Sequence, residues 1–384
     1  MVKLGIIGLG NMGTKHLANI TSGKVSGMEV TAICDIDADV RKAFEEKYPH
    51  IKMFESAEDL YKSGLCDSVI VATYHYDHPK LVMQAFDAGL DVITEKPAGV
   101  YTKQVQEMNE AAEKSGRLFG IMYNQRTNPL YQKIKKFVES GELGEIKRIQ
   151  WTITSWYRPQ AYHDSSPWRS NWKTEGGGAL INQNPHQLDL WQWMFGMPDR
   201  IYAKATYGKH YDIEVEDEVT AFLEYDNGVS GVYITSTGEF PGTNRLEIAC
   251  SRGKLVCEDD NLTFVRNEID EREFNRTNKV PFGRIDTWNC EIPKPENGGE
   301  QHVGIFKDWV KAKETGAPLL APGVEGINGL TISNAMHLSS WTGKEIDVKN
   351  FPHDEFYTLL QEKIKNSKPK KSKEKIKSDL EGTY

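Results

Sequence analysis

The pattern of hydrophobic and polar positions changes near residue 123 of the chain. Before that point, short apolar runs alternate with stretches in which apolar residues recur every three or four positions, which predicts strands that alternate with helices. The expected strands are residues 3–7, 28–34, 68–72, 91–94 and 118–122. The expected helices are residues 14–21, 37–47, 57–63, 79–88 and 102–115. Such alternation is typical of a parallel sheet covered by helices on both faces.

From about residue 146, apolar and polar residues alternate one by one, as in strands with one buried face. A turn at Asp226-Asn227-Gly228 and one helical stretch near residues 179–194 lie among these strands. The expected strands have the sequences IKRIQWTITSW, DRIYAKATY, EDEVTAFLEY, VSGVYITST, RLEIACS, GKLVCED and LTFVRN. Alternation of this kind, with tight turns between the strands, predicts a mostly antiparallel sheet.

The chain has 384 residues, which is long enough for two domains with separate cores. Its hydrophobic content of 39% and charged content of 27% are those of an ordinary soluble protein. No apolar run is long enough to cross a bilayer, and the first residues read as a strand rather than as a signal peptide. We expect an α/β fold with a parallel-sheet domain at residues 1–123, a second α/β domain at 124–362 and a Lys-rich tail at 363–384.

The five cysteines are scattered and never spaced C-x-x-C. This pattern predicts a reducing, cytoplasmic location and argues against both a disulfide framework and a cysteine metal site. The cysteines are Cys34, Cys66, Cys250, Cys257 and Cys290.

The net charge of −8 is distributed unevenly along the chain. Residues 363–377 carry eight lysines and one glutamate, or +7, so the rest of the chain carries −15 (−8 less +7). A body this acidic argues against nucleic-acid binding as a main activity. A solvated tail is the default interpretation of the lysine run; a patch facing an acidic neighbouring subunit and a weak anion site are the alternatives.

A glycine-rich turn, GLGNMG at residues 8–13, lies between the first expected strand and the first expected helix. In this context Gly8 allows the tight turn, Gly10 lets a pyrophosphate approach the backbone, and Gly13 lets the helix pack closely on the strand. Such a turn predicts a dinucleotide-binding Rossmann unit; the alternative is a strand–turn–helix unit that binds nothing. The neighbouring cofactor candidates in the turn are Asn11 and Met12.

An acidic residue at the end of the second strand supports the nucleotide interpretation. Asp35 follows Gly13 by 22 residues, close to the spacing of about 20 expected for the acid that binds a ribose diol. The next residue is Ile36 rather than an arginine that could pair with a 2′-phosphate. We therefore expect NAD rather than NADP as the cofactor.

Two further strands end in polar segments that should share the carboxyl edge of the sheet, where cofactors bind in such folds. The strand VIVAT runs into YHYDHP, and the strand LDVIT runs into EKPAG. Lys96 is either a surface charge or a group beside the nicotinamide, and Pro97 favours a purposeful placement because it restricts the backbone. The cofactor candidates at this edge are Thr73, Tyr74, His75, His78, Glu95 and Lys96.

The stretch EGGGALINQNPHQLDLWQWMFGMP, residues 175–198, combines a glycine triplet with polar residues at helical spacing. A helix from about Ala179 would place Asn182, His186, Asp189 and Trp193 on one face. Either these residues form a functional stripe or His186 is a histidine satisfied by its neighbours in the core.

Aromatic residues gather in the segment WTITSWYRPQAYHDSSPWRSNW, which holds four of the nine tryptophans. Flat aromatic faces interleaved with hydrogen-bonding groups suit a sugar ring. Trp151 and Trp156 fall within the strand pattern and are expected to cover the sheet, whereas Trp168 and Arg169 fall in the loop and are candidates for ligand contact. Further substrate candidates are Tyr157, His163, Asn124 and Arg126, and Gln125 is a cofactor candidate.

Five motifs in one order resemble the Gfo/Idh/MocA family of NAD(P)-dependent sugar and inositol oxidoreductases. They are GIIGLGNMGTKH, ATYHYDH, EKP, GGGALINQNPHQLDLWQWMFG and ISNAMHLSSWTGKEIDV, and they span essentially the whole chain. The resemblance implies an N-terminal Rossmann domain and a C-terminal α/β domain with a large, mostly antiparallel open sheet that forms homodimers or homotetramers. It also implies a small-molecule sugar, glycoside or inositol as substrate, with no nucleic-acid or membrane partner.

By the same resemblance, Lys96 is the active-site lysine and His186 is the catalytic histidine. The chain departs from the family at Asn182, where the family has an acid, so a lysine–histidine–aspartate relay is not available. Asn182 can still orient a substrate hydroxyl, and Asp189 lies one turn beyond His186, where it either tunes that ring or serves packing.

The mechanism we expect is hydride transfer from a secondary alcohol carbon of a sugar, glycoside or cyclitol to the nicotinamide, with C3 of a hexose or glucoside as a candidate position. His186 would accept the hydroxyl proton and Lys96 would hold the same oxygen. Redox-assisted glycoside cleavage, by transient C3 oxidation and elimination, is one alternative. A non-catalytic NAD-binding regulator is the other.

Overall fold

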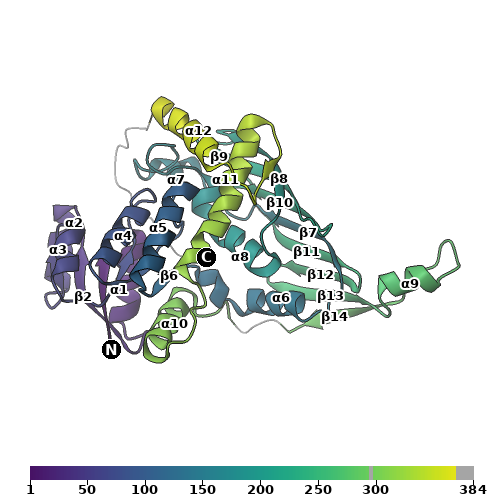
Figure 1. Cartoon of the computed structure of the whole chain (residues 1–384), viewed down its shortest axis with the longest axis horizontal. Coiled ribbons are helices and arrows are strands. Elements are labelled where there is room, and N and C mark those ends of the chain that lie inside the picture. Colours follow the sequence, from purple (N-terminus) through teal and green to yellow (C-terminus); the bar gives the residue numbers. More distant parts are fainter. Residues whose placement is uncertain (294–296, 369–384) are drawn as a thin grey trace.

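The computed structural model describes residues 1–293 and 297–368 and contains two sheets with helices packed against them (Figure 1). The first sheet has six parallel strands in the order β3-β2-β1-β4-β5-β6. Its strands are β1 Val2–Ile7, β2 Met28–Cys34, β3 Lys52–Phe54, β4 Ser68–Val71, β5 Asp91–Thr94 and β6 Phe119–Ile121. Its helices are α1 Asn11–Thr21, α2 Ala38–Lys47, α3 Ala57–Lys62, α4 His78–Asp87 and α5 Thr102–Ser115.

The strands of this sheet are covered on both faces, which is why their sequences are nearly continuous apolar runs. All four residues of β4 are buried. The five strands and five helices expected up to residue 123 are confirmed. The edge strand β3 was missed because it has only three residues and pairs with β2 alone.

The second sheet has nine strands in the order β14-β13-β12-β11-β7-β10-β9-β8-β15. All neighbouring pairs are antiparallel except β7 and β10, so the expected mostly antiparallel sheet is confirmed. Its strands are β7 Ile146–Ile153, β8 Arg200–Tyr207, β9 Glu216–Glu224, β10 Ser230–Ser236, β11 Asn244–Cys250, β12 Gly253–Glu258, β13 Asn261–Asn267, β14 Thr287–Ile292 and β15 Ile346–Asp347. Both β14 and β15 lie outside the seven expected strands.

One face of the large sheet is covered by helices. The alternation of apolar and polar residues in the strands does not predict them. Helices α6 (Pro129–Glu139), α8 (Pro185–Phe195) and α11 (Gly326–Thr342) lie against that face (Figure 1). On the opposite face, Tyr202 and Phe222 form a cross-strand pair and are 49% and 57% exposed. The remaining helices are α6 Pro129–Glu139, α7 Gln160–Asp164, α8 Pro185–Phe195, α9 Glu271–Thr277, α10 Gln301–Thr315, α11 Gly326–Thr342 and α12 His353–Asn366, with 3-10 turns at Asn124–Thr127 and Gly323–Glu325.

The prediction of a single helix near residues 179–194 is wrong. A π-helical turn, Ala179–Gln183, comes first, and α8 then begins at Pro185. The break follows from the proline, which has no N–H to continue a helix but is favoured in the first turn of a new one. Asn182 and His186 therefore belong to two different elements.

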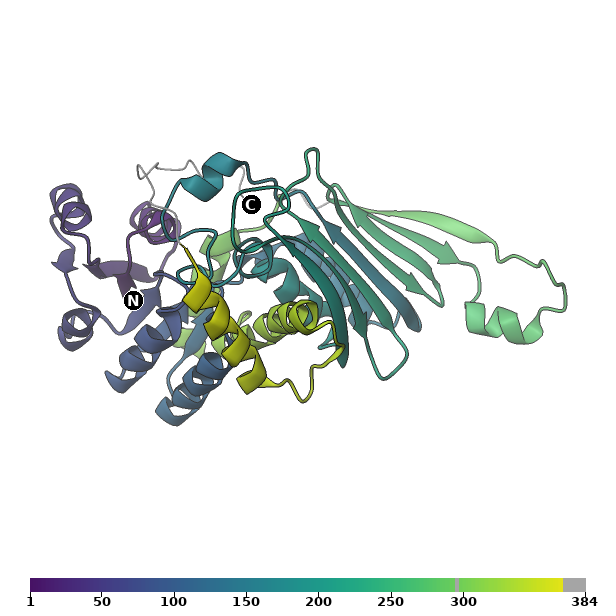
Figure 2. The same ribbon diagram turned by 90° about the horizontal axis from the view of Figure 1, so that it is seen from above.

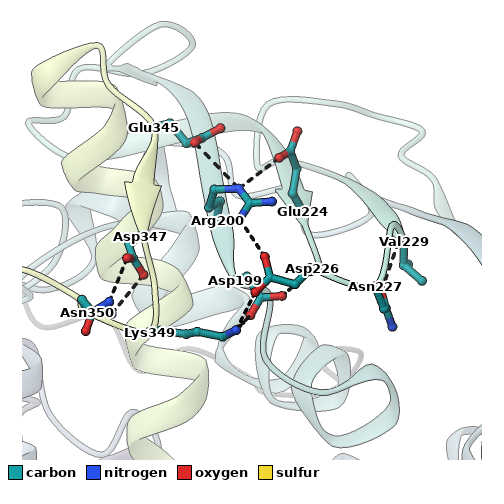
Figure 3. Close-up of polar contacts among 10 residues, drawn as sticks. All are labelled: Asp199, Arg200, Glu224, Asp226, Asn227, Val229, Glu345, Asp347, Lys349 and Asn350. Carbon is teal, nitrogen blue, oxygen red and sulfur yellow. Dashed lines mark hydrogen bonds and ion pairs between the residues drawn. The ribbon is translucent and has the colours of Figure 1, made fainter.

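The segment between α11 and α12 is tied to the large sheet by exposed ion pairs (Figure 3). Lys349 Nζ lies 2.6 Å from Asp199 Oδ1 and 2.7 Å from Asp226 Oδ2, and Arg200 Nη1 lies 2.8 Å from Asp226 Oδ1. These partners lower the pKa of both carboxyl groups. The expected turn at Asp226-Asn227-Gly228 carries one of these acids, and Gly228 adopts the positive φ of 89° that the turn requires.

Two peripheral features are the hairpin between β13 and β14 and the Lys-rich tail. The hairpin between β13 and β14, with α9 at its tip, extends beyond the sheet (Figure 2). The Lys-rich tail expected at residues 363–384 starts inside α12, where Lys363 Nζ lies 4.7 Å from the centre of the Trp341 ring, so Lys363 is packed rather than solvated. The part of the tail from residue 369 onward lies outside the described residues. Among the described residues, no helix is both long enough and apolar enough to cross a membrane.

Candidate active site

The three glycines of the GLGNMG segment, two between β1 and α1 and one in the first turn of α1, differ in what surrounds them. A Cβ on Gly13 would lie 1.9 Å from the carbonyl oxygen of Gly8, and a Cβ on Gly8, whose φ is +94°, would lie 2.6 Å from the carbonyl oxygen of Ala72. A Cβ on Gly10 would meet nothing within 4 Å. Packing therefore requires Gly8 and Gly13, while the backbone at Gly10 faces open space that a pyrophosphate can enter.

The first turn of α1 adds a favourable field at the same place. No side chain caps its N-terminus in the described part of the chain. A helix start of this kind directs backbone N–H groups and the positive end of the helix dipole toward an anion. The turn thus has the chemistry that a dinucleotide phosphate needs.

Asp35 lies beside the glycine-rich turn, at the carboxyl end of β2. Its Oδ2 accepts a hydrogen bond from Leu9 N at 2.7 Å, and its Oδ1 accepts one from Asp37 N at 2.9 Å. Arg41 is held nearby by the carbonyl oxygen of Asp35 at 2.8 Å and by Glu55 at 3.1 Å. The carboxylate is therefore held in place at the position from which the acid of such folds binds a ribose diol.

The segments after β4 and β5 meet at the carboxyl edge of the first sheet, as expected. His78 lies between the carbonyl oxygens of Thr73 and Pro97, at 3.1 and 2.8 Å from its ring nitrogens, and so joins the two segments. The Trp168 ring lies 5.4 Å from Tyr74 and 5.3 Å from His75. The aromatic loop before the glycine triplet therefore covers this edge.

Glu95 is buried under that edge. Its Oε1 lies 2.6 Å from His16 Nε2, and its Oε2 accepts a hydrogen bond from Lys96 N at 3.1 Å. Burial acts to raise the pKa of Glu95, but the hydrogen bond from His16 and the nearby charges outweigh it, so the pKa is lowered. Glu95 therefore contacts α1 and the next residue rather than the open side of the edge.

Lys96 connects the first sheet to the glycine-triplet segment. Its Nζ donates a hydrogen bond to the carbonyl oxygen of Asn182 at 2.8 Å. Burial lowers the pKa of Lys96 to about 8, with Arg158 and Arg169 acting in the same direction and Glu95 and Glu175 against it. The amine is thus charged at neutral pH but close enough to its pKa to exchange a proton.

His186, at the start of α8, is the buried imidazole of the site. It is 4% exposed, and neither of its ring nitrogens has a hydrogen-bond partner among the described residues. Burial and then the charge of Lys96 hold the pKa of His186 well below its usual range. A neutral imidazole without a partner is unlike a core histidine satisfied by its neighbours, and it is able to accept a proton.

Asn182 faces a carboxylate that the sequence analysis did not single out. Its Nδ2 donates to a carboxylate oxygen of Glu175 and to the hydroxyl of Tyr162 at 3.3 Å. Glu175 is 3% exposed, and its second carboxylate oxygen accepts a hydrogen bond from the backbone N–H of Ser170. Burial raises the pKa of Glu175 to about 7. Its only sequence signal is that it precedes the glycine triplet directly.

Asp189 and Arg126 do not face the site. Arg126 Nε and Nη2 donate to the two oxygens of Asp189 at 2.9 and 2.6 Å, and Nη1 lies 2.7 Å from Glu325 and donates to Leu320 O at 3.0 Å. The carboxylate of Asp189 is used by this buried pair and does not tune His186. The substrate contact expected of Arg126 disagrees with this arrangement, because all its nitrogens are engaged inside the protein.

The start of α10 reaches the same region and was missed in the sequence. Gln301 Oε1 accepts hydrogen bonds from Asn124 Nδ2 at 2.6 Å and from Gln125 Nε2 at 3.1 Å. The next residue, His302, is buried with its ring centre 5.5 Å from that of His16. Burial, together with the nearby charges, holds the pKa of His302 well below its usual range.

The aromatic loop contains the stacked residues Trp168 and Arg169 and the buried residue His163. Arg169 lies over the rings of Trp168 and Tyr162, at 4.5 and 4.4 Å from their centres, and its Nη1 donates to the Tyr162 hydroxyl at 2.6 Å. His163 is buried against Tyr211 and bonds Ser170 Oγ at 2.7 Å, so it supports the loop from within.

Three other aromatic residues of the segment divide between contact with solvent and packing on the sheet. Tyr157 is 39% exposed and packs on Phe240. Trp151 is buried in the sheet, as expected, and Trp156 packs against the core. The ligand contacts expected of Trp168 and Arg169 stay predictions.

Two family models match the chain. Residues 2–123 match the oxidoreductase family with an NAD-binding Rossmann fold, and residues 131–256 match the GFO/IDH/MocA C-terminal domain. Among the curated relatives, the myo-inositol 2-dehydrogenase of Thermotoga maritima is 22% identical over 342 residues, which are 87% of this chain and 95% of the relative. An inositol 2-dehydrogenase of Salmonella typhimurium is 30% identical over 201 residues, 50% of this chain and 54% of the relative.

Solved structures share the architecture. The WlbA dehydrogenase from Bordetella pertussis, in complex with NADH and UDP-GlcNAcA, has a TM-score of 0.74 and 25% identity, with 90% of this chain and 98% of that one covered. A levoglucosan dehydrogenase in complex with NADH and levoglucosan has a TM-score of 0.74 and 19% identity, with 90% and 99% covered. Because both family models match in order and the glycine-rich turn and Asp35 fit a dinucleotide, this chain is an NAD-binding oxidoreductase of the Gfo/Idh/MocA family.

Proposed function

We propose that the protein is an NAD-dependent dehydrogenase that oxidises a secondary alcohol carbon of a sugar, glycoside or cyclitol. The observation that carries the proposal is the buried, neutral and unpartnered imidazole of His186, whose pKa is affected by the nearby charge of Lys96. Relatives described as inositol dehydrogenases and a structural neighbour described as a levoglucosan dehydrogenase support the substrate class.

Bound NAD supplies the hydride acceptor. His186 accepts the proton of the substrate hydroxyl, and Lys96 holds the same oxygen and stabilises its developing negative charge. The C–H hydrogen leaves with its electron pair, the O–H proton goes to His186, and a ketone results. Asn182 orients a neighbouring hydroxyl, which fixes the carbon from which the hydride leaves.

The cofactor site would be built from the glycine-rich turn, Asp35 and the carboxyl edge of the first sheet. The residues we assign to it are Gly8, Gly10, Asn11, Met12, Gly13, Asp35, Thr73, Tyr74, His75, Gln125, Trp168 and Arg169. His78 and Glu95 support this edge from within, and Lys96 faces the substrate. The sugar would lie against Trp168 and Tyr157 with Asn124 at its rim, because aromatic faces bind the apolar C–H faces of a sugar ring. Arg126 and His163 act as supports instead.

The open face of the large sheet suits self-association. Tyr202 and Phe222 expose apolar area on paired strands, and a homodimer or homotetramer would cover it. The five cysteines are free thiols, which supports a cytoplasmic location.

The first experiment is to follow nicotinamide absorbance with purified protein, NAD and a panel of hexoses, glucosides and inositols, and to analyse each reaction for released aglycone. Accumulation of NADH with one group of substrates is the expected result. Aglycone release without net NADH would replace the proposal with redox-assisted glycoside cleavage. Tight NAD binding with neither signal would replace it with a regulator.

A further inference from the structure

The acid that the resemblance places four residues before the catalytic histidine is absent, and a different carboxylate occupies its surroundings. Glu175 lies seven residues before Asn182 in the sequence, yet its carboxylate contacts the Asn182 amide. Both carboxylate oxygens are engaged, one by Asn182 Nδ2 and the other by the backbone N–H of Ser170. A buried carboxylate with two donors is held in one orientation.

Asn182 joins this carboxylate to the reacting groups. Its backbone carbonyl oxygen accepts the hydrogen bond of Lys96 Nζ, and its side-chain Nδ2 is directed at Glu175 and the Tyr162 hydroxyl. Because an ionised carboxylate only accepts hydrogen bonds, it selects the amide orientation with Nδ2 toward Glu175. The amide Oδ1 is thereby left as an acceptor for a substrate hydroxyl.

The turn geometry explains why Glu175 can reach Asn182. The glycine triplet lies between them and adopts backbone conformations that favour glycine, with Gly176 at a φ of +85° and Gly177 at +157°. Gly178 N and Leu180 N both donate to the buried carboxylate of Glu216, which holds the turn in place. The acid and the amide are therefore brought together by a supported backbone and not by a flexible loop.

We propose that Glu175 is a positioning residue that supplies the active-site carboxylate missing at position 182: it orients the Asn182 amide toward the substrate hydroxyl and places a negative charge beside Lys96. The proposal rests on the proposed dehydrogenase function. In this arrangement the active-site carboxylate comes from Glu175, seven residues before the position of the family acid, and the amide of Asn182 lies between that carboxylate and the substrate. The arrangement keeps the charge but makes the group that contacts the sugar a neutral acceptor.

The charges around Glu175 agree with this role. Lys96 and Arg169 are the cations that act on it, and Glu216 is the like charge. Around Lys96, the charged groups are Glu95, Arg169, Arg158 and Glu175. Removing the charge of Glu175 therefore leaves Lys96 with two cations and one acid and should lower the pKa of the amine further.

The first test exchanges the two groups. Glu175→Gln should lower kcat by about 10- to 100-fold, as expected for loss of a charge-assisted hydrogen bond. Asn182→Asp should also lower kcat, because two carboxylates in contact cannot both ionise. The double variant E175Q/N182D restores one acid and one amide with the donor and acceptor exchanged, and its kcat should exceed that of either single variant.

The pH profile separates positioning from mere support. In the wild type, kcat should rise with pH through about 7 as Glu175 ionises, and this inflection should vanish in E175Q. Asp189→Asn is the matched control: it removes the charge of Asp189 in the buried ion pair with Arg126 and should lower the melting temperature while keeping the inflection. An E175Q enzyme with the wild-type kcat and profile, or a double variant no better than the single ones, would overturn the proposal.

A second measurement does not depend on turnover. The rate of Lys96 acylation against pH, read by peptide mass spectrometry with NAD bound, reports the pKa of the amine. It should be lower in E175Q than in the wild type. An unchanged Lys96 pKa overturns the positioning proposal whatever the activity, whereas a wild type without hydride transfer to NAD on any substrate overturns only the proposed dehydrogenase function.

Discussion

Burial is the largest influence on the pKa of three ionisable residues in the site. It lowers the pKa of Lys96 to about 8, holds the pKa of His186 well below its usual range and raises the pKa of Glu175 to about 7. At neutral pH the lysine is therefore charged while the imidazole is neutral. An electrophile and a base beside one oxygen are what alcohol oxidation requires.

Removal of either reacting side chain should separate catalysis from cofactor binding. We expect His186→Ala and Lys96→Ala to lower kcat by about 10²- to 10⁴-fold, the usual contribution of a positioned acid or base, with the NAD dissociation constant unchanged. Stopped-flow hydride transfer and fluorescence titration with NADH measure the two quantities. The exposed His50 provides a control, since His50→Ala should change neither. Loss of NAD binding with unchanged turnover of the bound enzyme would contradict the assignment.

The raised pKa of Glu175 also has a consequence for stability. An acid whose pKa rises from 4.5 to about 7 on folding binds more protons in the native state, so its contribution to stability is present below pH 4.5 and is lost as pH rises through about 7. The free energy of unfolding of Glu175→Gln relative to wild type should increase by up to about 3 kcal/mol between pH 4.5 and 8. Urea denaturation at several pH values measures it; a difference that does not vary with pH would mean that Glu175 is ionised throughout.

At the scale of elements, short connections decide where the functional groups lie. The glycine-rich turn brings α1 against β1, the segments after β4 and β5 share one edge, and the break at Pro185 separates the π-helical turn of Asn182 from α8. Each connection has a local cause that can be changed by one substitution.

Gly10 and Gly13 should respond differently to substitution by alanine. Gly13→Ala forces a contact of 1.9 Å with the Gly8 carbonyl, so we expect loss of both stability and NAD binding. Gly10→Ala meets no protein atom within 4 Å, so the melting temperature should stay at the wild-type value while NAD affinity falls, because the methyl group occupies the space of the pyrophosphate. Calorimetry of both variants distinguishes them; equal NAD affinity in G10A and wild type would place the phosphates elsewhere.

For the whole molecule, the main division is between a first sheet buried on both faces and a large sheet with one open face. The exposed pair of Tyr202 and Phe222 lies on that face, away from α6, α8 and α11. The edge of the first sheet to which we assign the cofactor and the open face to which we assign self-association are therefore on different sheets.

If the protein associates through the open face of the large sheet, a substitution on that face should change the mass of the oligomer in solution. Phe222→Arg should shift the protein to the monomer in light scattering after size-exclusion chromatography, because a buried charge without a partner is costly at an apolar interface. Val324→Arg, at an exposed valine in a 3-10 turn outside the large sheet, should leave the mass unchanged. An F222R protein with the wild-type mass would exclude this face as the interface.

Features with a local cause were determined by the sequence alone. The alternating elements up to residue 123, the glycine-rich turn with Asp35, and the seven strands β7–β13 follow from periodicity and turn chemistry within a few residues. The helices α10 and α11 were missed because their buried residues lie on several sides and show no simple stripe. The helices α6 and α12 were also missed, although their buried residues do recur at helical spacing.

The tertiary structure alone decided which polar groups meet. Arg126 binds Asp189 across 63 residues, Gln301 reaches Asn124 across 177, and Lys96 reaches Asn182 across 86. Glu175 contacts Asn182 across seven residues that include the glycine triplet. A sequence states which donors and acceptors exist and which local structure each residue favours. The partner of a buried polar group is chosen by the packing of distant elements, because burial requires that each such group be satisfied by whatever the fold brings within reach.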